Sequence, residues 1–236
     1  MWTRLELKAR TKEAFHRNYW SCVVVAIVMM VITSATSNTA NKNSSEALES
    51  SGSGFGNVEF LAFMIALLAI SAIVMIIAII LKIVIGNALL VGGSRFFIAN
   101  QVEKARIAEL VFGFKSGGFG NIVLVMFLRD LFTWLWTLLL IVPGIIKHYE
   151  YLMVPYILAE NPQMSRKEVF QISKQMMMGQ KMNAFVLDLS FIGWRLLQAI
   201  TFGIVGVFYV EPYYQATIAE MYTANKSIAY QNGFIR

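Results

Sequence analysis

FLAFMIALLAISAIVMIIAIIL, residues 60–81, is the stretch of this sequence that decides the fold. Its 22 residues carry no charge, and Ser71 is the only polar side chain among them. A helix of about 20 apolar residues matches the hydrocarbon thickness of a bilayer. A single segment there can satisfy its backbone hydrogen bonds only as a helix. The sequence therefore predicts an integral membrane protein.

The composition of the whole chain agrees with this prediction. Of the 236 residues, 57% are hydrophobic and 14% are charged, whereas a soluble domain carries about 25% charged residues. The net charge of +6 could indicate nucleic-acid binding, but the basic residues lie between apolar spans. Orientation in a membrane explains them better, so no nucleic-acid partner is expected. Cys22 is the only cysteine and is expected to be a packed thiol.

The expected architecture is all-α: a polytopic transmembrane bundle of about six membrane helices in three hairpins, with short cytoplasmic amphipathic helices. We expect a span starting at Tyr19 to be retained rather than cleaved as a signal peptide. Turns are expected at Pro143-Gly144 and Thr201–Gly203, because proline and glycine interrupt long apolar runs there. We expect a single domain, 1–236. Its expected parts are an amphipathic helix, 1–18, and a first hairpin, 19–92, with a polar outer loop, 38–57. These are followed by an interfacial helix plus second hairpin, 94–160, an interfacial helix plus third hairpin, 164–224, and a cytoplasmic tail, 225–236.

Basic residues predict the orientation. Five lie in the first 18 residues, four in 92–119 and four in 161–183, whereas residues 38–59 hold only one. Basic loops stay on the cytoplasmic side, so both termini are expected there, in a bacterial cell membrane. This topology leaves Lys147, His148 and Glu150 at the outer end of the fourth helix.

The cytoplasmic segments show helical patterns of their own. Ser165 and Glu168 have the spacing of a capping box, and the apolar residues that follow are Val169, Ile172 and Met176. Another apolar series at helical spacing is Ile98, Val102, Ala105 and Phe112. Such helices either lie on the inner leaflet or pack on the bundle. In the first case the candidate lipid-headgroup contacts are Arg166, Lys167 and Lys174.

Charged residues inside expected spans are the candidate polar site, because a charge in a membrane usually faces a partner or water. The candidates are Arg129, Asp130, Asp188, Arg195 and Glu211. Arg195 and Glu211 are expected at similar depth on facing helices, and we predict that they pair. Arg129 and Asp130 are neighbours, so they are expected to point about 100° apart. Two interpretations stay open: a buried pair that fixes helix register, and a substrate or proton path.

No pattern indicates an enzyme, a metal site or a cofactor. The two histidines, His16 and His148, do not have metal-ligand spacing, and no phosphate-binding loop or serine-nucleophile motif is present. We therefore expect a protein without catalytic residues and without a cofactor. An intramembrane enzyme would require Asp130 and Asp188 to meet across the bundle.

One order of motifs resembles a known family. The motifs are IVPGIIKHYEYLMVPYILAENP at 141–162, a segment from Ser165-Arg166 to Gly179-Gln180-Lys181, LSFIGWRLL at 189–197, Pro212-Tyr213 with Thr217, Gly92–Phe97 and Gly113-Phe114-Lys115. This order is similar to that of the domain of unknown function (DUF) 975 family of bacterial integral membrane proteins. The resemblance implies a multi-pass bacterial membrane protein, and it implies no activity and no site residues.

Two functions therefore remain in competition. The first is a non-enzymatic membrane protein that binds lipid or a partner protein in the cell envelope, because its basic interfacial helices suit anionic lipid. The alternative is a small transporter or channel that uses the intramembrane charges. Membrane lipids are the expected partners, with a homo-oligomer or a second membrane protein as further possibilities.

Overall fold

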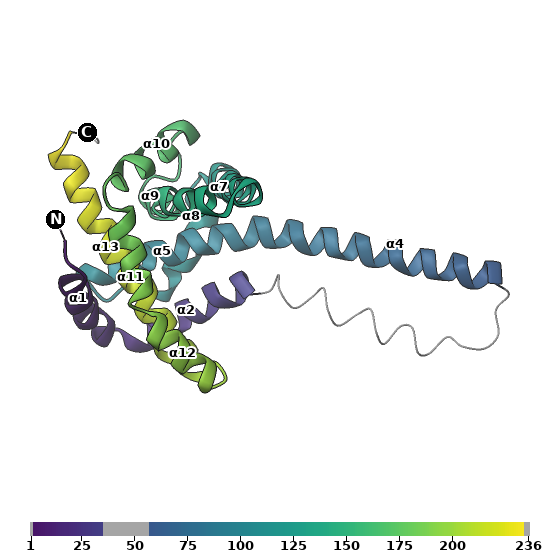
Figure 1. Ribbon diagram of the computed structural model, residues 1–236, viewed down its shortest axis with the longest axis horizontal. Coiled ribbons are helices and arrows are strands. Elements are labelled where there is room, and N and C mark those ends of the chain that lie inside the picture. The colour runs from purple at the N-terminus through teal and green to yellow at the C-terminus, as the bar shows by residue number, and fades with distance from the viewer. Residues whose placement is uncertain (1, 35–56, 234–236) are drawn as a thin grey trace.

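The computed structural model describes residues 2–34 and 57–233 of the chain, and its regular elements in these ranges are all helical (Figure 1). The expected outer loop, 38–57, lies outside the described residues except for Asn57. Two described helices, Leu61–Val102 and Phe119–Leu139, are long and apolar enough to cross a membrane. A third span is added if the bent pair formed by residues 4–17 and 19–31 is counted as one.

A long helical rod projects from the body of the protein (Figure 1). It consists of α4 (Asn57–Leu81), a π-helical segment η1 (Lys82–Gly86) and α5 (Asn87–Val102). Between Leu61 and Leu81 every side chain except that of Met64 is exposed. A helix that is apolar all round and exposes those apolar side chains is typical of a membrane span. The helix predicted from residues 60–81 is thus present, and it continues twenty-one residues further.

The expected boundary between the first hairpin and an interfacial helix, 92–94, was wrong, because it falls inside α5. Gly92 does not end the helix there; its missing side chain lets the helix approach the Leu110 carbonyl. Leu110 belongs to the 3₁₀ segment η2 (Ile107–Val111), which leads into the short helix α6 (Phe112–Lys115). The expected apolar stripe is therefore interrupted after Val102, whose side chain is 84% exposed.

The N-terminal helix packs on the last helix. α1 (Arg4–Arg17) begins with a capping box between Thr3 and Glu6, and the hydrogen bonds from Thr3 lower the pKa of the Glu6 carboxyl. The face of α1 that contains Leu7 and Phe15 is buried, and α1 contacts α13 (Glu211–Gln231). The chain then bends by 104° into α2 (Tyr19–Ser34), which packs between α5 and α13.

The next two helices, α7 (Phe119–Leu139) and α8 (Ile141–Glu150), pack against each other around Leu140. The turn thus comes three residues before the Pro143-Gly144 predicted from the sequence. Pro143 instead occupies the first turn of α8, where no intrahelical partner for its missing N–H is required. Gly144 allows close contact with Thr137 of α7. α9 (Val154–Glu160) follows and packs on α5.

The last part of the chain contains α10 (Arg166–Met176), α11 (Lys181–Leu189), α12 (Ile192–Ile200), the π-helical segment η3 (Gly206–Val210) and α13. The turn predicted at Thr201–Gly203 is confirmed, with positive φ angles of 50° at Phe202 and 88° at Gly203. Ser165 caps α10 by accepting a hydrogen bond from the Glu168 N–H, as predicted.

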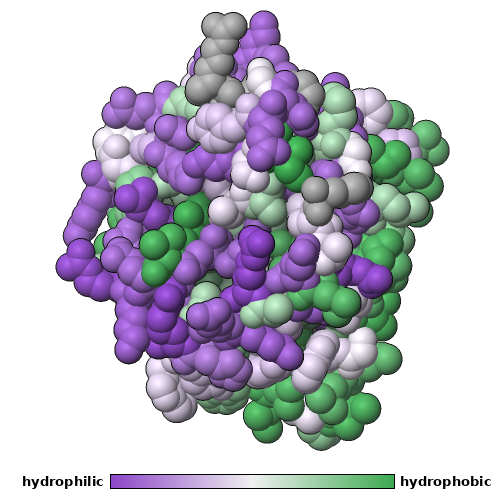
Figure 2. All heavy atoms as spheres, turned by 90° about the vertical axis from the view of Figure 1, so that its left-hand side faces the viewer, coloured by the Kyte–Doolittle hydropathy of each residue, from purple (hydrophilic) through white to green (hydrophobic). Residues whose placement is uncertain are grey.

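Polar and apolar residues occupy different parts of the surface. In Figure 2 hydrophilic residues cover most of the face that lies on the side of the two chain ends, and hydrophobic residues gather along the right and lower edges. The first and last helical regions are joined directly near the two chain ends, because Trp2 Nε1 donates a hydrogen bond of 2.6 Å to Asn225 Oδ1 of α13. The two termini therefore lie on the same side of the body.

Candidate functional site

Asp188 is the centre of a polar cluster between α8, α11 and α13. Its carboxylate accepts hydrogen bonds from the Tyr149 hydroxyl at 2.7 Å and the Tyr214 hydroxyl at 2.9 Å. The Arg195 guanidinium lies 5.4 Å from the centroid of the Tyr214 ring. The two tyrosines come from α8 and α13 and bind the same carboxylate. We call Tyr149, Asp188, Arg195 and Tyr214 the Asp188 cluster.

Glu150 is the centre of a second cluster beside the first. Its carboxylate lies 2.6 Å from Lys147 Nζ and 2.5 Å from Lys181 Nζ, and its side chain is only 7% exposed. Ser173 Oγ donates a hydrogen bond of 2.6 Å to the Glu150 carbonyl. Glu150 is not among the site residues predicted from the sequence. The Lys147 partner could have been found from its three-residue spacing, whereas the partners from α10 and α11 are distant in sequence.

The Glu150 cluster corrects the expected topology. Lys147 and Glu150 were placed at the outer end of a fourth span, and Lys181 was placed in a cytoplasmic segment. Groups on opposite sides of a bilayer about 30 Å thick cannot form an ion pair of 2.5 Å. Lys147 and Lys181 both contact Glu150, so a topology that places Glu150 and Lys181 on opposite sides of a bilayer does not fit the structure.

The other charged residues of the candidate site, Arg129, Asp130, Arg195 and Glu211, have partners that differ from those predicted. Arg129 Nη2 lies 2.6 Å from the Asp130 carboxylate, so these neighbours pair with each other rather than pointing apart. The predicted Arg195–Glu211 pair was wrong: Glu211 accepts a hydrogen bond from Gln215 at 2.8 Å, and Arg195 lies over Tyr214. The reason is that Glu211 begins α13, where a residue one turn later can reach it.

The basic residues of α10 have the exposure that contact with headgroups requires. Arg166, Lys167 and Lys174 are all exposed. The apolar side of the helix, by contrast, faces the protein: Val169 and Met176 are buried, and Ile172 packs against the core. Of the two expectations for this helix, packing on the bundle is the one that the structure shows.

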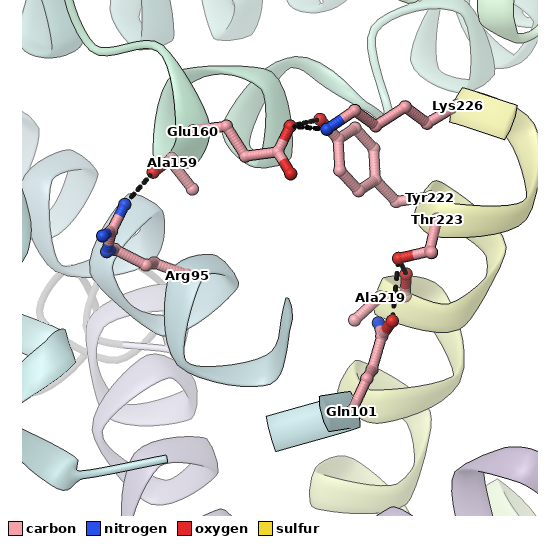
Figure 3. A network of polar contacts seen from close by, with 8 residues as sticks. All are labelled: Arg95, Gln101, Ala159, Glu160, Ala219, Tyr222, Thr223 and Lys226. Atoms are coloured by element: carbon pink, nitrogen blue, oxygen red, sulfur yellow. Dashed lines mark hydrogen bonds and ion pairs between the residues drawn. The ribbon is translucent and has the colours of Figure 1, made fainter. Parts of the chain in front are cut away.

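A third polar network ties α9 to α13 (Figure 3). The Glu160 carboxylate accepts a hydrogen bond of 2.7 Å from the Tyr222 hydroxyl and lies 2.5 Å from Lys226 Nζ. Next to it, Arg95 Nη1 donates a hydrogen bond of 2.8 Å to the Ala159 carbonyl. The end of α9, at Ala159 and Glu160, is thus the point where α5, α9 and α13 are joined.

The same motif also holds the start of α7. Asn121 Nδ2 donates hydrogen bonds to the carbonyls of Pro162 and Met164, at 3.0 and 2.9 Å. Gly118, the residue before α7, lies so close to the Pro162 carbonyl that a side chain would overlap it. These contacts fix the start of α7 against the segment after α9.

The described residues thus define an all-helical protein with two or three helices able to cross a membrane. Residues 138–228, from the end of α7 into α13, match a family model described as "Protein of unknown function (DUF975)". The match covers 91 of the 236 residues and agrees with the resemblance seen in the sequence. The three polar networks lie within or against the matched region. The comparisons with curated proteins and with solved structures gave no match.

No group of three or more histidine, cysteine, aspartate or glutamate side chains that could hold a metal ion occurs within residues 2–34 and 57–233. The carboxylates of Glu150, Glu160 and Asp188 contact lysine or hydroxyl groups of other helices, whereas Asp130 and Glu211 have their partners within their own helices. The first three carboxylates therefore favour a stabilising role between helices.

Replacing Asp188 by asparagine is expected to lower stability. The amide is neutral and keeps only one oxygen, so both tyrosine hydroxyls lose a charged acceptor and one of them loses its acceptor altogether. A hydrogen bond to a charged group is worth about 1.5–3 kcal/mol, and we expect a loss of that size in detergent thermal-shift measurements. Asp130→Asn is the matched control, because the Asp130 side chain is 54% exposed. Equal melting temperatures for the two variants would contradict the prediction.

Proposed function

We propose that this chain is a non-enzymatic, multi-pass protein of the bacterial cell membrane that binds anionic lipid headgroups at its cytoplasmic side. The observation that carries this proposal is the apolar surface of α4, where every side chain from Leu61 to Leu81 except that of Met64 is exposed. Lipid is the solvent that such a surface requires. The expected first hairpin, 19–92, would cross the bilayer, with both termini in the cytoplasm.

The exposed charges of α10 support the lipid-binding part of the proposal. Because its apolar side is used up in packing on the protein, the helix is held in place with Arg166, Lys167 and Lys174 on its free side. A basic residue near an anionic membrane surface contributes about 1 kcal/mol. The segment 104–115 adds Lys104, Arg106 and Lys115, which are also exposed.

The lipid preference can be measured by titrating the purified protein in detergent with phosphatidylglycerol or phosphatidylcholine and counting bound lipids by native mass spectrometry. In the triple variant Arg166→Gln, Lys167→Gln, Lys174→Gln, the ratio of phosphatidylglycerol to phosphatidylcholine binding is expected to fall about tenfold or more. A charge-retaining triple variant, Arg166→Lys, Lys167→Arg, Lys174→Arg, is the control and should keep it. An unchanged preference in the neutral variant would remove the basis of the proposal.

The alternative of a transporter or channel is less well supported. Asp130 pairs with Arg129, Asp188 with two tyrosines and Glu211 with Gln215, so these acidic groups already have partners within the chain. Ion or substrate flux through proteoliposomes that disappears in Asp188→Asn would reverse this preference.

A further inference from the structure

We propose that the two C-terminal hairpins each enter only the cytoplasmic leaflet of the membrane and do not cross it. The hairpins are α7–α8, which turns at Leu140, and α12–η3, which turns at Thr201–Gly203. The inference rests on the proposal above that the protein is embedded in a membrane. It replaces four of the six spans expected from the sequence by two shallow insertions.

The uncharged part of the α7–α8 hairpin is too short for a crossing. It runs from Leu131 to Ile146, sixteen residues bounded by the Arg129–Asp130 pair on one arm and by Lys147 on the other. At 1.5 Å per residue, the tip lies roughly 15 Å beyond Asp130 and roughly 10 Å beyond Lys147. The hydrocarbon core is about 30 Å thick, so the tip reaches about its middle.

The α12–η3 hairpin has nearly the same dimensions. Its uncharged part runs from Leu196 to Val210, fifteen residues bounded by Arg195 and Glu211. A hairpin that crosses a bilayer needs about 20 residues in each arm. A crossing would therefore place Arg195 and Glu211 deep in hydrocarbon, where charges are costly, and the structure provides no ion pair between these two residues to offset that cost.

Both hairpin tips consist of apolar side chains that are exposed on the surface of the protein. Side chains at the α7–α8 tip are 61% exposed at Leu140 and 71% at Ile141, and Phe202 at the other tip is 98% exposed. In Figure 2 hydrophobic residues form the right and lower edges of the molecule, away from the hydrophilic face. Lipid acyl chains are the occupant that fits, because the apolar surface ends where the charged residues begin.

Contacts at the base of each hairpin point to the cytoplasmic side. Lys8 of α1 donates a hydrogen bond of 2.7 Å to Ser190 Oγ, two residues before α12. The α7–α8 hairpin is joined at its base to Lys181 through Glu150. α1 and the segment 161–183 are the strongly basic parts of the chain, which remain in the cytoplasm. Each hairpin therefore starts and ends on that side.

Labelling of single cysteines with a membrane-impermeant maleimide tests this inference. Cys22 is buried and is replaced by alanine, and the test positions are Leu140→Cys and Phe202→Cys. Lys174→Cys, which is exposed on α10, should be labelled only in inside-out vesicles. Ser53→Cys, in the expected outer loop outside the described residues, should be labelled only in intact cells. We expect the two tip cysteines to be labelled from neither side, and only after detergent is added.

Labelling of either tip in intact cells would show a crossing and overturn the inference, and labelling in inside-out vesicles would show that the tip is not inserted. A spin label at the same two cysteines adds a measurement of depth in liposomes. High collision rates with oxygen and low rates with a nickel chelate are expected near the bilayer centre. Low rates with both reagents would mean that protein covers the tips, which also overturns the inference. Lipid selectivity of the α10 variant is measured separately, so failure of the two proposals can be distinguished.

Discussion

Gly92→Ala is expected to cause the largest loss of stability among single substitutions. Its Cβ would overlap the carbonyl carbon and oxygen of Leu110, which are backbone atoms and cannot rotate away. α5 would have to separate from η2, and both are packed into the body. Overpacking usually costs about 1–3 kcal/mol and occasionally more, and because backbone must move here we expect about 3 kcal/mol or more. Heating the detergent-solubilised protein and following its monodisperse fraction by size-exclusion chromatography measures the loss.

Gly120→Ala is the control for this prediction. Gly120 lies in the first turn of α7, and a Cβ there would meet no atom within 4 Å. Alanine is favoured over glycine in a helix by about 1 kcal/mol, so this variant should be as stable as the parent or slightly more so. Similar heating curves for Gly92→Ala and Gly120→Ala would show that the close approach of α5 to η2 is not required.

The second large effect is expected from Glu150→Gln. The carboxylate is almost completely buried and neutralises both Lys147 and Lys181. Removing one partner of a buried ion pair costs about 3–5 kcal/mol. Because the two lysines are 24% and 32% exposed and can regain some hydration, we expect about 2–4 kcal/mol in the same assay.

Two further variants identify the cause. Glu13→Gln, at an exposed position of α1, should leave the melting temperature within a degree or two. Adding Lys147→Met and Lys181→Met to Glu150→Gln should recover part of the loss, because no charge is then left without its counter-ion. A loss that the methionines do not reduce would mean that Glu150 acts through its shape or its backbone rather than through charge.

The sequence predicted the parts of the fold that depend on local chemistry. The span at 60–81 follows from uninterrupted apolar composition, the start of α10 from the Ser165–Glu168 spacing, and the turn at Thr201–Gly203 from glycine. The turn predicted at Pro143-Gly144 was three residues too late, because proline is accepted in the first turn of a helix. The chain turns at Leu140 instead. Nothing local marks Leu140 as the residue that leaves the helical conformation.

The candidate site was predicted less well because its contacts are long-range. Asp188 was identified as a charge in an apolar segment, but its Tyr149 partner lies 39 residues away. Glu150 and Lys181 were assigned to opposite sides of the membrane because basic residues were counted loop by loop, with each apolar run taken as a complete crossing. Only the packing of α8 against α11 shows that the two belong on the same side.

The contact between the first and last helices has a consequence for synthesis of the protein. Trp2 and Asn225 are 223 residues apart, and the buried face of α1 packs on α13. At about 5–20 residues per second, α1 waits on the order of 10–50 s for its partner to leave the ribosome. Chains that terminate before Glu211 never bury this face, so we expect them to be recognised and degraded by membrane proteases.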